Sequence, residues 1–319
     1  MIQVSNLSKK FDSFCAVNNI SFSVQPGEVL GFLGPNGAGK STTMKILTGF
    51  LSPSAGEVSV MGHNVLKNPI AAQREIGYLP EGAPSYEDMS VISSLQFIGK
   101  ARGFFGKELK QRIDSVVSKV ELESVLLKRV ETLSKGFRRR LGIAQALIHD
   151  PKVLILDEPT DGLDPNQKHQ VRELIRNLSE DKTVIVSTHI LEEVSAVCSR
   201  AMILAKGEIV FDGTPDELAA KSDFHNAVTI RLAKHSEVVI AALKKLPGVK
   251  NVSVGSDDQI TVFSKDGQSI LAEVNQVLQR GGCLLDELHV EAGRLDDVFR
   301  KVTLDDTMNT SLNETKEQA

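Results

Sequence analysis

Residues 29–41 read VLGFLGPNGAGKS, an apolar run followed by a glycine-rich turn that ends in lysine and serine. The run at 29–33, with turn residues on either side, is typical of a short buried strand. Residues 34–41 match the pattern G-x-x-x-x-G-K-S, and a helix is expected to begin near Lys40. Glycines let the backbone of such a turn point its N–H groups at one anion. The sequence therefore predicts a phosphate-binding loop.

This phosphate-binding loop is expected to hold a nucleotide. Lys40 can reach the β- and γ-phosphates of ATP, and the hydroxyl of Ser41 can ligate the Mg²⁺ that accompanies them. We therefore expect ATP and Mg²⁺ as cofactors. The predicted nucleotide contacts in the loop are Gly34, Pro35, Asn36, Gly37, Ala38, Gly39, Lys40, Ser41 and Thr42.

A second element, VLILDE at 153–158, ends an apolar run with two acidic residues. Its four apolar residues predict another buried strand, with Asp157 at its tip. Asp157 can hold the Mg²⁺ shell, and Glu158 can polarise the attacking water as a general base. A run ending in Asp-Glu is weak evidence alone, but it becomes specific when it follows a phosphate-binding loop in the same domain.

The first 222 residues alternate strand-like and helix-like segments, which predicts an α/β domain with a largely parallel core sheet. The sequence GTPDEL at 213–218 predicts one further helix start, with Thr214 as the cap and Glu217 completing a capping box. Strands are expected at 2–4, 20–24, 29–33, 56–60, 153–156 and 184–186, and helices at 40–48 and 167–178.

From residue 227 the pattern restarts as a second domain, 227–303. Its segments follow the order β-α-β-β-α-β, which is that of a small α+β ferredoxin-like unit. A short amphipathic helix is expected at about 295–301. The polar tail from 304 to 319 is expected to be disordered.

Length and composition narrow the function classes. A chain of 319 residues can hold two domains, and a net charge of −4 with a pI of about 6.0 argues against a nucleic-acid partner. The three cysteines are scattered, as expected of reduced thiols, and no His/Cys cluster predicts a zinc site.

No stretch approaches the ~20 apolar residues that cross a bilayer, and the N-terminus lacks a signal-peptide pattern. For work at a membrane, another chain is expected to supply the spanning part.

With these motifs in place, the chain resembles the ATP-binding subunits of ABC transporters over nearly all of residues 1–220. LSKGF at 133–137 stands where the family has its signature LSGGQ. EPTDGLDP at 158–165 looks like the family's Walker B to D-loop junction, and STHILEEV at 187–194 looks like its switch. The resemblance implies a P-loop NTPase cassette with a RecA-like core, an antiparallel β part and a helical subdomain at about 86–150.

The resemblance also implies roles for single residues. His189 would sense the γ-phosphate, so the implied catalytic pair is Glu158 and His189. Asp164 would be the D-loop aspartate. Phe11 matches the aromatic that stacks on adenine, and Val17 matches the small apolar residue beside it.

The signature segment has its own physical logic. Ser134 precedes a segment with apolar residues at helical spacing, so Ser134 and Gly136 are expected at a helix N-terminus, which attracts anions. In the family, the signature closes over the γ-phosphate held by a second cassette, which implies a head-to-tail homodimer in the closed state. Lys135 and Phe137 replace glycine and glutamine of the common signature. The three arginines at 138–140 are interpreted as a solvated basic face of the helix, with direct contact to phosphate as the alternative.

Glu81 stands at the Q-loop position, where most members of the family carry glutamine. A carboxylate there can still accept from Mg²⁺-bound water, but it adds negative charge near the metal. With glutamate at this position, the chain resembles a subset of exporter-type subunits, which are drug/multidrug or gliding-motility-like. Some of these subunits have a C-terminal extension that ends in a motif like L-E-x-V-F. RLDDVFRKVT at 294–303 resembles that motif.

The sequence therefore predicts an ATP-hydrolysing subunit that energises a membrane exporter through a separate multi-span permease. Its expected location is peripheral, on the cytoplasmic face of the inner (plasma) membrane. A soluble ABC-type ATPase that acts on ribosomes or DNA is one alternative, although such proteins usually carry two cassettes or a long coiled coil. A regulatory ATPase that senses a small ligand through its ferredoxin-like domain is another.

Overall fold

The computed structural model describes residues 1–232, 237–255 and 259–301. By its internal contacts the chain forms two compact units, 1–213 and 214–319. The division precedes helix α8 (Pro215–Ala219), which the sequence analysis placed in the first domain. The tail expected at 304–319 lies outside the described residues. Every helix in the described ranges is too short or too polar to cross a bilayer.

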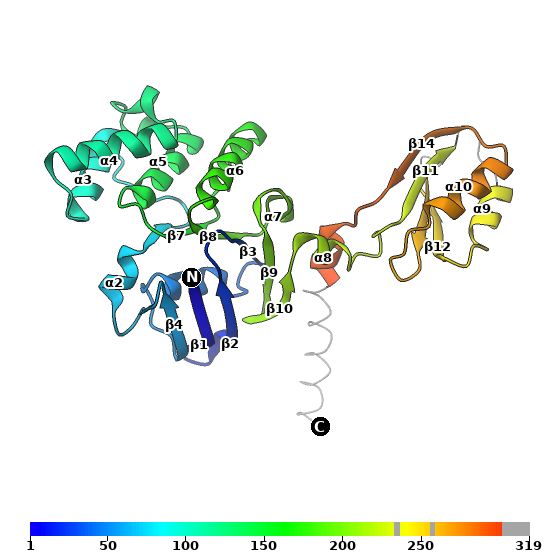
Figure 1. Cartoon of the computed structure of the whole chain (residues 1–319), viewed down its shortest axis with the longest axis horizontal. Helices are drawn as coiled ribbons and strands as arrows, with labels where there is room; N and C mark the ends of the chain where they lie inside the picture. The colour runs from blue at the N-terminus through cyan, green and yellow to red at the C-terminus, as the bar shows by residue number, and fades with distance from the viewer. Residues whose placement is uncertain (233–236, 256–258, 302–319) are drawn as a thin grey trace. The chain divides into compact units, whose positions relative to one another are not determined.

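A largely parallel sheet forms the centre of the first unit (Figure 1). Its strands follow the order β10-β9-β3-β8-β7-β6, and only β10 runs antiparallel to its neighbour. All residues of β3, β7 and β8 are buried, as expected of parallel strands covered on both faces. The strands are β3 (Val29–Leu33), β6 (Ile76–Leu79), β7 (Val153–Asp157), β8 (Thr183–Thr188), β9 (Arg200–Ala205) and β10 (Glu208–Gly213).

An antiparallel sheet in the order β2-β1-β4-β5 forms a second layer. Its N-terminal hairpin is longer than the sequence predicted, because β1 and β2 pair as far as Phe11 and Phe14. Register shifts interrupt this pairing, so polar and apolar residues do not alternate regularly along the two strands. The sequence pattern therefore revealed only the segments 2–4 and 20–24. The strands are β1 (Ile2–Phe11), β2 (Phe14–Val24), β4 (Ala55–Val60) and β5 (His63–Asn64).

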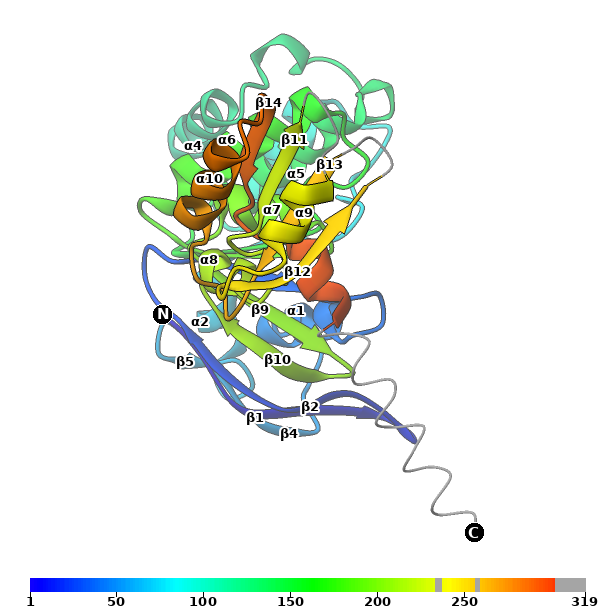
Figure 2. The same cartoon turned by 90° about the vertical axis from the view of Figure 1, so that its right-hand side faces the viewer.

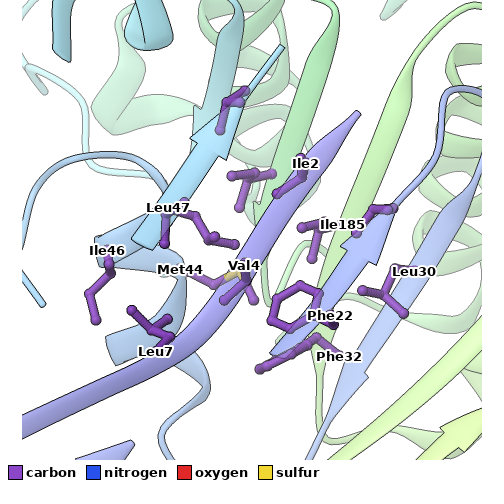
Figure 3. Close-up of a cluster of buried hydrophobic side chains, with 14 of the residues drawn as sticks. Ile2, Val4, Leu7, Phe22, Leu30, Phe32, Met44, Ile46, Leu47 and Ile185 are labelled. Atoms are coloured by element: carbon purple, nitrogen blue, oxygen red, sulfur yellow. The ribbon is translucent and has the colours of Figure 1, made fainter. Parts of the chain in front are cut away.

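The two sheets and helix α1 (Lys40–Leu47) enclose an apolar core (Figure 3). Phe22 of β2 and Phe32 of β3 meet there with ring centroids 5.7 Å apart. Met44 and Leu47 of α1 are fully buried in the same cluster. Burying a large apolar side chain contributes about 1.5–3 kcal/mol. This packing therefore holds α1, and with it the end of the phosphate-binding loop, against both sheets.

Helices gather between β6 and β7 along the chain, within the predicted helical subdomain at about 86–150 (Figure 1). The last of them, α5, packs closely on β6, because a Cβ added to Gly142 would lie 2.5 Å from Leu79 Cδ1. These helices are α3 (Val91–Ala101), α4 (Gly106–Lys119) and α5 (Lys135–Leu147), with the 3-10 turns η1 (Glu123–Val125) and η2 (Val130–Thr132). The other helices of the first unit are α2 (Pro69–Arg74), α6 (Pro165–Ser179) and α7 (Leu191–Val197).

The three arginines at 138–140 do not form the solvated face that the sequence suggested. Arg139 is only 6% exposed. Arg138 donates to a backbone carbonyl 2.7 Å away, and Arg140 donates to the carboxylate of Glu121 at 2.7 Å. The interpretation fails for Arg139 and Arg140, because other segments cover α5 where these side chains lie. The side chain of Arg138 remains 39% exposed.

The second unit has the predicted β-α-β-β-α-β order, and its antiparallel sheet runs β12-β13-β11-β14. Helices α9 and α10 lie on one face of this sheet (Figure 2). Ile230, Ile260 and Val274 are fully buried between the helices and the sheet. Residues 295–301 are helical, as predicted. The elements are β11 (Val228–Leu232), α9 (Glu237–Leu243), β12 (Val249–Val254), β13 (Gln259–Ser264), α10 (Leu271–Arg280) and β14 (Leu285–Val290).

Candidate nucleotide-binding site

The phosphate-binding loop joins β3 to α1, and two glycines set its shape. Gly34 and Gly39 have φ angles of 159° and 103°. A Cβ at Gly34 would lie 2.3 Å from the backbone oxygen of Leu204, and one at Gly39 would lie 2.3 Å from that of Ala16. Any other side chain would collide with β9 or β2. Glycine is therefore needed at both positions for the loop to fold this closely.

Lys40 begins α1 and turns its ammonium into the loop. Its Nζ donates to the carbonyls of Gly34 at 2.7 Å and Pro35 at 3.2 Å, and the residue is 6% exposed. Burial lowers the pKa of Lys40, while nearby carboxylates, foremost that of Glu158, act in the opposite direction. Because neutral carbonyls are weaker partners than anionic oxygens, an incoming phosphate can take over these hydrogen bonds.

A pocket opens beside the ammonium of Lys40. Most of the predicted loop contacts line this pocket, together with Glu81 and Glu158. From the sequence, Glu81 was expected near the metal and Glu158 beside the attacking water. Pro35 lies at the exposed tip of the loop, while Gly34 and Ala38 are buried beneath it. The residues that line the pocket are Phe14, Ala16, Asn36, Gly37, Gly39, Lys40, Ser41, Thr42, Glu81 and Glu158.

The two residues assigned to adenine are not in this lining. Phe11 is 44% exposed and has the ammonium of Lys9 5.0 Å from its ring centroid, whereas Val17 is fully buried. The lining contains Phe14, which is 60% exposed, and Ala16 instead. Phe11 and Phe14 pair across one hairpin turn. The sequence shows both aromatics, but only the strand register decides which ring faces the pocket.

Strand β7 ends in a buried carboxylate. Asp157 is 2% exposed, and its Oδ1 has no hydrogen-bond partner. Ser187 lies opposite Asp157 on the neighbouring strand β8, and its hydroxyl is also buried without a hydrogen-bond partner. An orphaned buried carboxylate oxygen is costly unless a cation or a donor satisfies it. The described residues contain no cluster of three or more His, Cys, Asp or Glu side chains suited to a metal, so a cation here would take further ligands from the nucleotide and water.

Glu158 lines the pocket and contacts His189, which is not itself among the lining residues. Glu158 has a left-handed backbone, with a φ of 50°, and its N–H donates to the carbonyl of Ser187 at 2.9 Å. Nδ1 of His189 lies 3.0 Å from both carboxylate oxygens of Glu158. The Glu158 side chain is 12% exposed and that of His189 is 48% exposed. The pair can therefore present a base and an imidazole to one ligand in the pocket.

Ser134 lies at a helix N-terminus, as predicted. It caps α5, and its hydroxyl accepts from the N–H of Phe137 at 3.4 Å. Ser134 lines a pocket of its own, which shares no residue with the pocket beside Lys40. The phosphate-binding loop and the signature segment therefore line two separate pockets within one chain.

The residues next to Ser134 pack on the segment between β7 and α6. The ammonium of Lys135 lies beside Gly162, where an added Cβ would be 3.1 Å from Nζ. Gly136 is buried against the side chain of Gln167. Asp164 caps α6, because its carboxylate accepts from the N–H of Gln167 at 2.9 Å. The signature and the predicted D-loop therefore form one contiguous surface.

Comparison with known proteins agrees with this geometry. The family described as ABC transporter matches residues 17–161. The linearmycin resistance ATP-binding protein LnrL of Bacillus subtilis (strain 168) is 34% identical over 255 residues, which cover 80% of this chain and 82% of the relative. The Nod factor export ATP-binding protein I of Rhizobium sp. (strain N33) is 33% identical over 303 residues, which cover 95% and 96%.

A solved structure shares the fold. The dimeric post-hydrolysis structure of the ATP-binding cassette MJ0796, bound to ADP and Pi, matches with a TM-score of 0.61 and 26% identity over 67% of this chain and 99% of the other. The family assignment and these relatives support the transporter interpretation over the ribosome, DNA and ligand-sensor alternatives. The chain belongs to the ATP-binding proteins of ABC transporters, and it is the ATP-hydrolysing subunit of such a transporter.

Proposed function

We propose that this subunit binds MgATP in the pocket beside Lys40 and hydrolyses it with Glu158 as the general base, thereby energising an exporter. The observation that carries this proposal is the 3.0 Å contact of His189 with Glu158, which lines that pocket. The ammonium of Lys40 binds the β- and γ-phosphates. Glu158 accepts a proton from the attacking water, and His189 holds the γ-phosphate.

Asp157, Ser41 and Glu81 are assigned to Mg²⁺. The unpartnered Oδ1 of Asp157 supports this assignment, and Ser41 and Glu81 line the pocket beside Lys40. Mg²⁺ binds through few protein ligands and keeps several waters, so one carboxylate, one hydroxyl and a phosphate chain suit it. When bound, the ion neutralises charge that develops on the phosphates. Glu81 would accept a hydrogen bond from a water molecule bound to the ion, at a position where most members of the family carry glutamine.

We assign a second copy of the chain to the closed nucleotide site. Ser134 and the α5 N-terminus line a different pocket from Lys40, so they are free to bind the γ-phosphate held by a partner copy. Lys135 adds a cation to this surface. The dimeric ADP-bound structure of the related cassette supports a dimer of this chain, for which we propose head-to-tail contacts.

ABC cassettes work as dimers with membrane permeases, and we assign a separate multi-span permease to this subunit. Relatives named for linearmycin resistance and Nod factor export favour an exporter. A permease partner would hold the dimer peripherally on the cytoplasmic face of the inner (plasma) membrane, where ATP is supplied. Glu81, which lines the nucleotide pocket and precedes the helical subdomain, would pass the motion of the pocket to the permease.

Affinity capture from gently solubilised membranes, followed by an ATPase assay with and without Mg²⁺, tests this proposal. The proposal predicts that a multi-span permease co-purifies and that the captured complex hydrolyses ATP only with Mg²⁺. Capture of ribosomes or DNA in place of a permease would contradict the transport role. A permease complex without Mg²⁺-dependent hydrolysis would contradict the assigned chemistry.

A further inference from the structure

Glu193 is a buried carboxylate outside the pockets beside Lys40 and Ser134. It lies on α7 and is 3% exposed. Its two oxygens accept hydrogen bonds from two different threonine hydroxyls, because Thr160 donates to Oε1 and Thr188 donates to Oε2 at 2.8 Å. One carboxylate therefore joins the segment that follows β7 to the end of β8.

The two threonines flank the residues that carry the proposed chemistry. Thr160 lies two positions after Glu158, and Thr188 immediately precedes His189. The hydroxyl of Thr188 also accepts from the N–H of Ile190 at 3.0 Å. The residues on both sides of His189 are therefore held by hydrogen bonds. Because the His189 side chain is 48% exposed, packing alone does not hold it. Besides the direct contact of His189 with Glu158, these backbone anchors therefore set where the imidazole lies.

Both oxygens of Glu193 serve as acceptors in this arrangement. Burial raises the pKa of Glu193, and the nearby charge of Glu158 raises it further, while the Thr188 hydrogen bond and the cations Arg172 and Lys168 lower it. A buried carboxylate is costly unless its oxygens are hydrogen-bonded, and here each oxygen has a donor. The site therefore keeps a buried polar carboxyl at an energetic cost, which an apolar residue in α7 would avoid.

We propose that Glu193 is a positioning residue that holds the segments after β7 and β8 in one register and thereby keeps His189 in contact with Glu158. The inference rests on the proposed roles of Glu158 and His189. Glu193 does not line the nucleotide pocket, so it acts only through Thr160 and Thr188.

Substitution of Glu193 should separate kcat from KM. In the full-length subunit with its permease, Glu193→Leu removes both acceptors and is expected to lower kcat roughly ten- to hundredfold, the range associated with misplacing a reacting group by about 1 Å. Glu193→Gln keeps one acceptor oxygen and should fall between this variant and the parent. KM for ATP should stay near the parent value in both. Glu192→Gln is the matched control, because its exposed side chain is on the same helix, and it should behave as the parent.

Thr160→Val provides a second test that does not depend on how well Glu193→Leu folds. This nearly isosteric change removes one hydroxyl and should also lower kcat with KM unchanged. Combined with Glu193→Leu, it should add nothing further, since both changes break the same link. The inference is overturned if Thr160→Val and Glu193→Gln keep the parental kcat, or if KM and ATP binding fall in step with kcat.

The positioning role of Glu193 and the catalytic role of Glu158 can be disproved separately. If the parent hydrolyses ATP and Glu158→Gln does not, while the Glu193 and Thr160 variants match the parent, only the positioning role is lost. If the parent and Glu158→Gln turn over equally, the proposed function itself is lost.

Discussion

His189 and Glu158 are each the first residue after one of two neighbouring parallel strands, and Nδ1 of His189 lies 3.0 Å from both oxygens of the Glu158 carboxylate. The carboxyl ends of parallel strands meet at one edge of a sheet, where ligands of such folds bind. Pairing of β7 with β8 therefore joins residues that are distant in sequence, and it places them beside the pocket that contains Lys40.

Replacing His189 by alanine should lower ATP turnover by roughly 10²-fold, the size of effect expected when one group that stabilises the reacting phosphate is removed. ATP affinity should change little, because the phosphate-binding loop is untouched. Steady-state hydrolysis and equilibrium ATP binding measure the two effects separately. His169→Ala, at an exposed position of α6, is the matched control. Equal turnover in the two variants would remove His189 from the mechanism.

Replacing Lys40 by alanine should weaken ATP binding roughly ten- to hundredfold, because hydrogen bonds to charged groups contribute about 1.5–3 kcal/mol. Equilibrium dialysis with ATP measures the change. Lys45→Ala removes an exposed ammonium from the same helix and should bind ATP like the parent. ATP affinity that is the same for both alanine variants would show that the pocket beside Lys40 is not the triphosphate site.

Replacing Gly39 by alanine should destabilise the first unit and weaken ATP binding together. The new Cβ would lie 2.3 Å from the backbone oxygen of Ala16 at a φ of 103°, and such strain costs on the order of 2 kcal/mol. Gly37→Ala is the matched control, because Gly37 also has a positive φ but has no atom within 4 Å of its added Cβ. Denaturant midpoints should therefore fall clearly further for Gly39→Ala, and equal midpoints would rule out the steric account of the loop.

His149 should make stability depend on pH. Burial, foremost, together with the charges of Arg102 and Arg112, lowers the pKa of His149 from 6.5 to about 4, and its Nε2 lies 3.0 Å from the carbonyl of Ile76. The Nδ1 is buried without a partner, so a proton there would be unsatisfied. Between these two pKa values the unfolded chain binds a proton that the folded chain does not. Stability is therefore complete above pH 6.5 and is lost as the pH falls towards 4.

Urea unfolding across that pH window tests the role of His149. The parent should lose on the order of 2 kcal/mol from this group, a value discounted for partial solvent exposure. His149→Gln can still donate to Ile76 and should flatten the slope. His169→Gln, at an exposed site, should leave the slope as in the parent. Identical slopes in the parent and His149→Gln would contradict the assignment.

Much of the site could be predicted because it depends on local sequence. The spacing from Gly34 to Ser41 determines a loop between a strand and a helix, and the run before Asp157 determines where that carboxylate emerges. Which aromatic residue of the N-terminal hairpin lines the pocket could not be predicted in this way. Phe11 and Phe14 lie on opposite sides of one turn, and the register shifts of the hairpin decide which ring lines the pocket.

Tertiary contacts decided the other features that the sequence did not reveal. Glu193 lies within the switch-like segment at 187–194, yet its proposed role depends on Thr160, which lies far away along the chain. Arg139 belongs to a run of basic residues that suggested a solvated face, but α5 turns it inward. Periodicity reports which residues can share a face of a helix, whereas contacts across the fold decide what that face meets.

The most direct test of the central claim is ATP turnover by the permease-bound complex with Glu158 or Gln at position 158. General-base catalysis typically contributes about 10²–10⁴-fold, so Glu158→Gln should lower Mg²⁺-dependent hydrolysis by that order. The variant should still bind ATP through Lys40, because the substitution leaves the phosphate-binding loop intact. Turnover by Glu158→Gln at the parental rate would contradict the account.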